Sequence, residues 1–220
     1  MKWNLVIFDL DGTLLDTIGD LGNAVNHAMT LHGWPLHTME EYRKMVGHGI
    51  RNLVQTAMPE PQKQDEGLVD LALKDFVQYY TAHIDVLTRP YDGVCDILER
   101  LQAAGTQIAV ASNKFQSGTE KLVGKFFPGI RFCAVYGNKE GQPLKPDAAI
   151  VRGAMAAAGN PELSRVVMVG DSATDMRTAA NGGITAVGVS WGFRTKEEIM
   201  AAGASTVVDT PARLAETLGI

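Results

Sequence analysis

Short apolar runs of strand length, rich in valine and isoleucine, recur along this chain and constrain its fold more than any other feature. Continuous runs of this kind suit strands of a parallel sheet, which is buried on both faces. Glycine, aspartate, serine or asparagine residues bound them, as expected at strand ends. The runs span residues 5–10, 107–111, 132–136, 166–169 and 184–189, and residues 206–209 are a candidate edge strand.

Segments with helical spacing separate the later runs, so the chain after residue 88 alternates strand and helix. This alternation predicts an α/β fold with a doubly wound, Rossmann-like parallel sheet. The helical segments span residues 92–104, 118–127, 147–158, 174–180 and 212–218.

The pattern differs between the first run and residue 88, where no strand-like run occurs. Helical spacing covers residues 20–31, 40–57 and 66–84, and Pro59 and Pro61 separate the last two stretches because proline interrupts helices. We therefore expect an α/β core of residues 1–15 and 88–220, into which residues 16–87 insert a helical cap.

The charge pattern excludes several classes of function. The formal net charge is −5 and no long basic run is present, which argues against a nucleic-acid ligand. No apolar run approaches the roughly 18 residues of a membrane span. The two cysteines form neither a CxxC pair nor a cluster with histidine, so neither zinc nor a disulfide framework is indicated. A cytoplasmic protein, monomeric or homodimeric, is the simplest expectation.

Polar residues follow several of the predicted strands at their carboxyl ends. In an open α/β sheet, ligands bind beyond these ends, so we expect the polar segments to meet at one crevice. The segments are DLDGT at residues 9–13, SN at 112–113 and GDSATD at 170–175, with KPD at 145–147 opening a helix.

Carboxylates at the ends of buried strands are costly unless a cation compensates them. Oxygen ligands without a histidine or cysteine cluster favour Mg²⁺, which pairs readily with phosphate groups. Lys145 adds positive charge, and the Ser112 hydroxyl with backbone amides at Gly12 and Asn113 would suit a phosphoryl group. The carboxylates concerned are Asp9, Asp11, Asp171 and Asp175.

The order of these four motifs resembles the haloacid dehalogenase-like superfamily of phosphohydrolases, and the resemblance covers essentially the whole chain. It implies that Asp9 is the nucleophile, which forms an aspartyl-phosphate. Asp11 would protonate the leaving oxygen and later deprotonate the hydrolytic water. Mg²⁺ would be held by Asp9, the Asp11 backbone carbonyl and Asp171, with Asp175 nearby or joined through water. The helical insertion resembles the small cap of this superfamily, whose closure excludes water.

The resemblance also implies that Ser112 and Lys145 bind the phosphoryl oxygens, and that Gly12 lets backbone amides approach the phosphate. Asp175 has an alternative role, because it could instead cap the helix that starts near residue 174. Asp16 and Asp20 are interpreted as helix-start residues.

A glycine-rich segment in the insertion is the best candidate for substrate specificity. Gly47, His48 and Gly49 precede Arg51, and two glycines in a helical region require a reason. Either His48 or Arg51 contacts the substrate, or the segment is a helix break with a solvated histidine.

The segments GHGIRNL, SNK and SWGF look like those of phosphoglycolate phosphatases. This resemblance implies a phosphatase for a small carboxylated phosphate monoester, 2-phosphoglycolate, with Arg51 or His48 meeting the carboxylate. The alternatives are a pyrophosphatase or broad sugar-phosphate phosphatase, a phosphomutase, and a catalytically silent protein that binds a phosphorylated ligand. Dehalogenases are disfavoured because they lack the second carboxylate, present here as Asp11.

Overall fold

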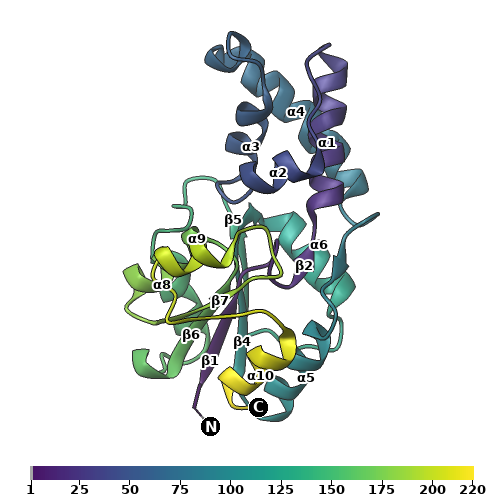
Figure 1. The fold of residues 1–220 in the computed structure, drawn as a ribbon. Coiled ribbons are helices and arrows are strands. Elements are labelled where there is room, and N and C mark those ends of the chain that lie inside the picture. The colour runs from purple at the N-terminus through teal and green to yellow at the C-terminus, as the bar shows by residue number, and fades with distance from the viewer. Residues whose placement is uncertain (1) are drawn as a thin grey trace.

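A six-stranded, fully parallel sheet forms the centre of the protein, which we describe from a computed structural model over residues 2–220 (Figure 1). The strand order is β5-β4-β1-β6-β7-β8, so β1 pairs with β4 on one side and with β6 on the other. The predicted doubly wound α/β sheet is therefore confirmed. The strands are β1 (Leu5–Phe8), β4 (Gln107–Phe115), β5 (Ala134–Asn138), β6 (Val166–Gly170), β7 (Thr185–Val189) and β8 (Thr206–Val208).

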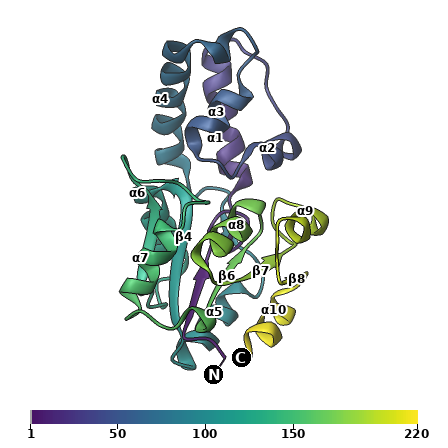
Figure 2. The same cartoon turned by 90° about the vertical axis from the view of Figure 1, so that its left-hand side faces the viewer.

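Helices cover both faces of the sheet, as the continuous apolar strands require (Figure 2). Val6 and Phe8 of β1 face one apolar cluster, which includes residues of α5 and α10, whereas Leu5 and Ile7 face a second cluster that includes residues of α7 and α8. The helices are α5 (Val94–Ala103), α6 (Gln116–Phe126), α7 (Ala149–Ala157), α8 (Ala173–Gly182), α9 (Lys196–Ala201) and α10 (Pro211–Leu218), with the 3-10 turn η2 (Leu163–Arg165) before β6.

Four further helices lie together beyond the carboxyl ends of the strands, at the top of Figures 1 and 2. Their sequence falls between β1 and β4, within the predicted insertion. None of the helices in the described part of the chain combines the length and apolar character of a bilayer span. The elements are α1 (Ile18–Leu31), α2 (Met39–Met45), α3 (Ile50–Ala57), the 3-10 turn η1 (Gln62–Gln64) and α4 (Glu66–His83).

The expected helical stretch over residues 40–57 is broken in the structure. Val46 is extended, and Gly47 and Gly49 have φ angles of 124° and 86°, a region that favours glycine because it lacks a Cβ. The chain therefore leaves α2 and starts α3 in a new direction, and the glycine-containing loop faces the sheet.

A two-stranded antiparallel ribbon, absent from the sequence-based expectation, joins the helical insertion to the sheet. Its strands are β2 (Leu15–Asp16) and β3 (Arg89–Pro90), paired Leu15 with Pro90 and Asp16 with Arg89. Strands of two residues are too short to show the periodicity on which strand prediction depends. The ribbon lies where the chain leaves the core and returns to it.

Asp20, in the first turn of α1, ties the outgoing and returning chains together. Its side chain is buried, and its carboxylate accepts hydrogen bonds from the backbone N–H groups of Leu87 and Thr88 at 2.8–3.0 Å. The Thr88 hydroxyl donates a further bond of 2.8 Å. Asp20 thus does more than begin a helix, because it satisfies backbone donors on the returning strand.

Replacing this carboxylate should destabilise the protein. Asp20→Ala would remove the acceptor of the Leu87 and Thr88 N–H groups, of which that of Thr88 is buried, and we expect the free energy of unfolding to fall by roughly 2–4 kcal/mol. Urea denaturation followed by circular dichroism measures the change. Glu140→Ala, which removes an exposed loop carboxylate, is the control and should change stability by less than about 0.5 kcal/mol. Equal effects of the two substitutions would contradict the proposed role of Asp20.

Candidate active site

The polar ends of β1, β4 and β6 meet in one cleft between the sheet and the helical insertion. The cleft is partly open to solvent, and both the core and the insertion contribute to its lining. Its floor comes from the core and its roof from α1 and from the loop and helix around residues 46–53. The core residues of the lining include Asp9, Asp11, Ser112, Asn113, Lys114, Lys145, Asp171, Ser172 and Arg194.

Asp9 lies directly beyond β1, at the centre of the sheet. Its backbone N–H still bonds to the Val169 carbonyl of β6 at 2.9 Å, which fixes the residue before the chain turns away. Its Oδ1 accepts the Leu10 N–H at 2.7 Å and lies 2.9 Å from Lys145 Nζ. Burial raises the pKa of the Asp9 carboxyl well above its usual range, and the nearby charge of Asp175 raises it further.

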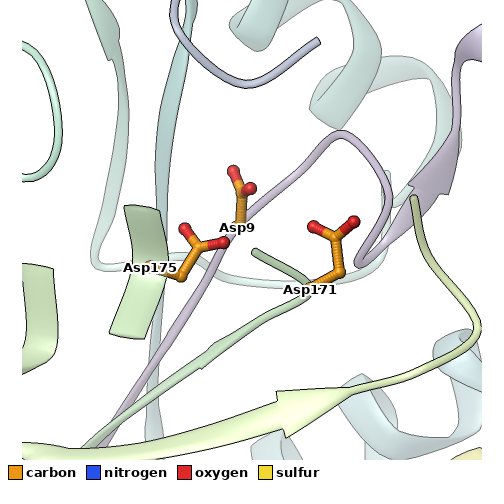
Figure 3. A group of neighbouring side chains, drawn as sticks. All are labelled: Asp9, Asp171 and Asp175. Carbon is orange, nitrogen blue, oxygen red and sulfur yellow. The ribbon is translucent and has the colours of Figure 1, made fainter. Parts of the chain in front are cut away.

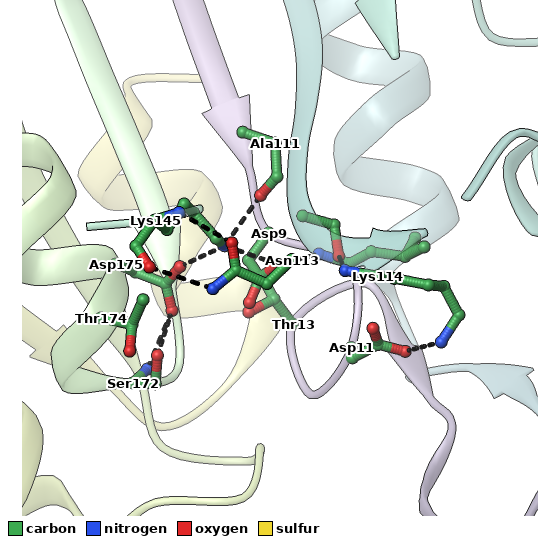
Figure 4. Close-up of polar contacts among 12 residues, drawn as sticks. Asp9, Asp11, Thr13, Ala111, Asn113, Lys114, Lys145, Ser172, Thr174 and Asp175 are labelled. Carbon is green, nitrogen blue, oxygen red and sulfur yellow. Dashed lines mark hydrogen bonds and ion pairs between the residues drawn. The ribbon is translucent and has the colours of Figure 1, made fainter. Parts of the chain in front are cut away.

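Lys145 is buried, and its ammonium group has three acceptors (Figure 4). Nζ lies 2.7 Å from Asp175 Oδ1, 2.9 Å from Asp9 Oδ1 and 2.8 Å from the Ala111 carbonyl oxygen. Burial alone would lower the pKa of this lysine, but Asp175 and Asp9 outweigh burial and raise it. Lys145 is therefore a fixed positive charge beside Asp9.

Asp171 follows β6 and is held by the loop after β7. Its Oδ2 accepts the Phe193 N–H at 2.7 Å, and the Thr13 hydroxyl lies 3.3 Å from Oδ1. Burial and the charge of Asp175 raise the pKa of Asp171 to about 7, despite the bond from Phe193. A Cβ at Gly192 would lie 2.4 Å from the Asp171 Cβ, so glycine is what lets this loop approach.

Asp175 combines the two roles considered for it, because it caps α8 and also contacts the site. Its Oδ2 accepts the Ser172 N–H at 3.1 Å and the Ser172 hydroxyl at 2.6 Å in a capping box, while Oδ1 binds Lys145. Both carboxylate oxygens therefore have partners, and Asp175 positions Lys145.

Asp9, Asp171 and Asp175 can together hold a metal ion. One oxygen from each lies within 4.8 Å of the others, and all three residues are buried (Figure 3). Burial, followed by the charge of Asp175, raises the pKa values of Asp9 and Asp171. The donor set is oxygen alone, so the cluster fits a hard divalent cation.

Three predicted phosphate-site residues lie in or beside the cleft with different environments. Ser112 lines the cleft, and its Oγ accepts the Lys114 N–H at 3.1 Å. The Asn113 side chain donates to the carbonyls of Gly47 and Lys145 at 3.1 Å and accepts the Lys145 N–H at 2.8 Å, so it connects the insertion to the core. Gly12 has a φ of 85° and its N–H bonds to Leu15, so this amide stabilises the turn.

The structure does not bring the two predicted specificity residues into the cleft. Arg51 is exposed on α3, and its guanidinium group forms ion pairs with Glu66 and Asp70 of α4. His48 is also exposed and is absent from the cleft lining. The lining instead uses Gly47 and Gly49 on either side of His48, together with apolar side chains of α3.

Lys114 is a buried cation that the sequence-based search did not assign. Its Nζ lies 2.8 Å from Asp11 Oδ1 and 4.9 Å from the centre of the Tyr80 ring. The side chains of Lys114 and Asp11 are 1% and 12% exposed, so solvent does little to weaken the pair. A lysine directly after the Ser-Asn pair is the available signal, and the predicted strand ended at residue 111, whereas β4 continues to Phe115.

Arg194 was also missed, and it contacts the insertion from the core. Its guanidinium group donates to the carbonyl oxygens of Arg43, Lys44 and Val46 at the end of α2. A cation at a helix C-terminus is favoured because carbonyls there lack partners. No local sequence pattern indicates such a contact, because its partners are about 150 residues away.

Comparison with known proteins agrees with this geometry. The model of the haloacid dehalogenase-like hydrolase family matches residues 6–189. Phosphoglycolate phosphatase from Mesorhizobium japonicum is 34% identical over 88% of this chain and 85% of its own length. The corresponding Caulobacter vibrioides enzyme is 35% identical over 92% of this chain and 85% of its own length.

A solved structure shares the complete architecture. It is a protein from Lactobacillus delbrueckii subsp. bulgaricus that is provisionally named a phosphoglycolate phosphatase, with a TM-score of 0.89, 31% identity and 99% of both chains covered. These relatives confirm the expected enzyme class, a phosphoric monoester hydrolase. The chain belongs to the haloacid dehalogenase-like hydrolase family.

Proposed function

We propose that this protein is a Mg²⁺-dependent phosphatase that converts 2-phosphoglycolate to glycolate and phosphate through an aspartyl-phosphate intermediate. The proposal rests on one observation: Asp9 and Asp11 are two residues apart, but their carboxylates contact different lysines. Asp9 faces Lys145 and the acidic cluster, whereas Asp11 faces Lys114. This difference supports the proposal that Asp9 attacks phosphorus and that Asp11 exchanges a proton.

In the first step, an oxygen of Asp9 attacks phosphorus as the bond from phosphorus to the ester oxygen breaks. The ester oxygen leaves with the proton of the Asp11 carboxyl group, which becomes a carboxylate. Lys145, fixed by three acceptors, would face the phosphoryl oxygens together with Ser112. Their charge and hydroxyl would stabilise the negative charge that develops in the transition state.

In the second step, a water molecule attacks the phosphorus of the aspartyl-phosphate. Asp11, now a carboxylate, accepts the water's proton, and the bond from phosphorus to Asp9 breaks to release inorganic phosphate. Asp9 and Asp11 return to their starting states. The roof formed by residues of the insertion, including Val46, Ile50 and Leu53, excludes bulk water from this chemistry.

Asp9, Asp171 and the backbone carbonyl of Asp11 are the groups proposed to hold Mg²⁺, with Asp175 adjacent. When bound, the ion offsets the charge of the carboxylates and of the phosphoryl oxygens. Asp175 Oδ1 binds Lys145 and its Oδ2 binds Ser172, which supports a role for Asp175 in positioning Lys145. Residues 16–87 are proposed to act as the cap of this enzyme.

The substrate assignment is supported by the names of the relatives, several of which are phosphoglycolate phosphatases at 32–35% identity. Broad sugar-phosphate and pyrophosphate hydrolysis are the competing activities, and a substrate panel separates them.

Asp9→Asn tests the nucleophile. The amide cannot form the aspartyl-phosphate, so we expect kcat for 2-phosphoglycolate to fall by at least roughly a thousandfold. Phosphate release with Mg²⁺ is measured for 2-phosphoglycolate, pyrophosphate and several sugar phosphates. The wild-type protein should prefer 2-phosphoglycolate. Equal kcat/KM values across the panel would refute the substrate, and normal turnover by Asp9→Asn would refute the mechanism.

Mg²⁺ should stabilise the wild-type protein, and Asp171→Asn should abolish the effect. At a Mg²⁺ concentration about tenfold above Kd, we expect Tm to rise by roughly 3–6 °C, because the ion binds the folded state. Differential scanning fluorimetry measures this shift. Glu140→Gln, an exposed control, should keep the wild-type response. A full Mg²⁺ shift in Asp171→Asn would show that the ion binds elsewhere.

Without Mg²⁺, the Tm of Asp171→Asn should depend on pH differently from that of the wild-type protein. The pKa of Asp171 is raised to about 7 by burial, so its charged form is disfavoured in the folded protein. The destabilisation therefore grows as pH rises from the ordinary value of 3.8 to about 7, and it levels off at higher pH. In chelator at pH 8, Asp171→Asn should have a higher Tm than wild type, and this difference should disappear near pH 4. A lower Tm for the variant at pH 8 would contradict the raised pKa.

Arg51→Ala should leave catalysis almost unchanged, in contrast to the expectation from sequence. The guanidinium group is paired with Glu66 and Asp70 on the outside of the insertion, away from the lining of the cleft. We expect kcat/KM for 2-phosphoglycolate to stay within about twofold of wild type. A tenfold rise in KM would instead mean that Arg51 leaves α4 to bind substrate.

A further inference from the structure

The substrate proposed above carries a carboxylate in addition to its phosphate, and neither His48 nor Arg51 lines the cleft. We propose that Lys114 binds the substrate carboxylate and so sets the preference of the enzyme for carboxylated phosphate esters. This inference rests on the proposed function and adds a specificity-determining residue to it.

Lys114 is a cation of the cleft lining whose ammonium group has donors to spare. The lining contains Lys114, Lys145 and Arg194 as its basic residues. Lys145 uses its ammonium protons on Asp175, Asp9 and the Ala111 carbonyl, and Arg194 binds the carbonyls at the end of α2. Lys114 has three ammonium protons and one hydrogen bond from Nζ, to Asp11, among the described residues.

The ammonium group of Lys114 lies beside Asp11, apart from Lys145 and Asp175 (Figure 4). Asp11 must lie within hydrogen-bond distance of the ester oxygen in order to protonate it, and Lys114 Nζ is 2.8 Å from Asp11 Oδ1. The path from Nζ to the ester oxygen therefore consists of one hydrogen bond to Asp11, the Asp11 carboxylate itself, and one hydrogen bond from Asp11 to the ester oxygen. In 2-phosphoglycolate the carboxylate is joined to this oxygen through a single methylene group, so it lies within the same short span.

The surroundings of Lys114 strengthen an interaction with an anion. Its side chain is 1% exposed, and the ring of Tyr80 covers one side of the ammonium group at 4.9 Å. Charge pairs are stronger in such a site because water screens them little. Asp11 is its single ion-pair partner among the described residues, so a substrate carboxylate would add a second anion to a lysine that has donors for both.

The test compares two substrates that differ in the carboxylate alone. 2-Hydroxyethyl phosphate replaces the carboxylate of 2-phosphoglycolate with a neutral hydroxymethyl group. We expect wild-type kcat/KM to be at least tenfold higher for 2-phosphoglycolate, and Lys114→Met to lower this preference to about twofold or less. Asp11 loses its lysine partner in this variant, which should lower kcat/KM for both substrates alike. The ratio of the two kcat/KM values therefore isolates the contribution of the substrate carboxylate. Lys114→Arg, which keeps the charge, should restore part of the preference.

Lys74→Met, which removes an exposed lysine of α4, is the matched control and should keep the wild-type ratio. If Lys114→Met lowers kcat/KM equally for both substrates, Lys114 positions Asp11 and does not bind the carboxylate, and the inference is overturned. A wild-type ratio near one would overturn it even if the variant did not fold. Absence of turnover for every phosphate ester would instead refute the proposed function, from which this inference follows.

Discussion

The buried ion pairs of Lys145 with Asp9 and Asp175 are the interaction on which the remainder of the site depends. Burying charged groups is costly, and the cost is offset here because each ammonium proton has an acceptor. The arrangement needs three strand ends at one edge of the sheet. β1 supplies Asp9, β4 supplies the Ala111 carbonyl, and the helix after β6 supplies Asp175. A parallel sheet with β1 at its centre provides this convergence.

The helical insertion lies over the site because the chain leaves the core immediately after Asp11. The ribbon formed by β2 and β3 and the buried contacts of Asp20 join the outgoing chain to the returning one. Two core side chains then contact the loop after α2. Arg194 binds carbonyls at the end of that helix, and Asn113 donates to Gly47. Asn113 also binds the backbone of Lys145, so the roof and the floor of the cleft share one side chain.

The sheet and the acidic cluster were predictable because both depend on local pattern. Buried parallel strands appear as apolar runs, and the fold itself brings their polar ends together, so Asp9, Asp171 and Lys145 could be located without knowledge of contacts. Arg51 shows the limit, because its partners on α4 depend on how two helices pack. Lys114 was missed for a related reason: the sequence does not reveal that β4 continues through it and buries its side chain.

Asp9 and Asp11 differ by two positions but have different electrostatic surroundings, and this difference is a basis for dividing the chemistry between them. Asp9 shares Lys145 with Asp175 and lies near Asp171, so burial and like charge raise its pKa until a further cation is present. Asp11 has a lysine of its own in Lys114 and is separated from that cluster. In the proposed mechanism, the metal and the phosphoryl group would lie on the side of Asp9, and the leaving group would lie beside Asp11 and Lys114.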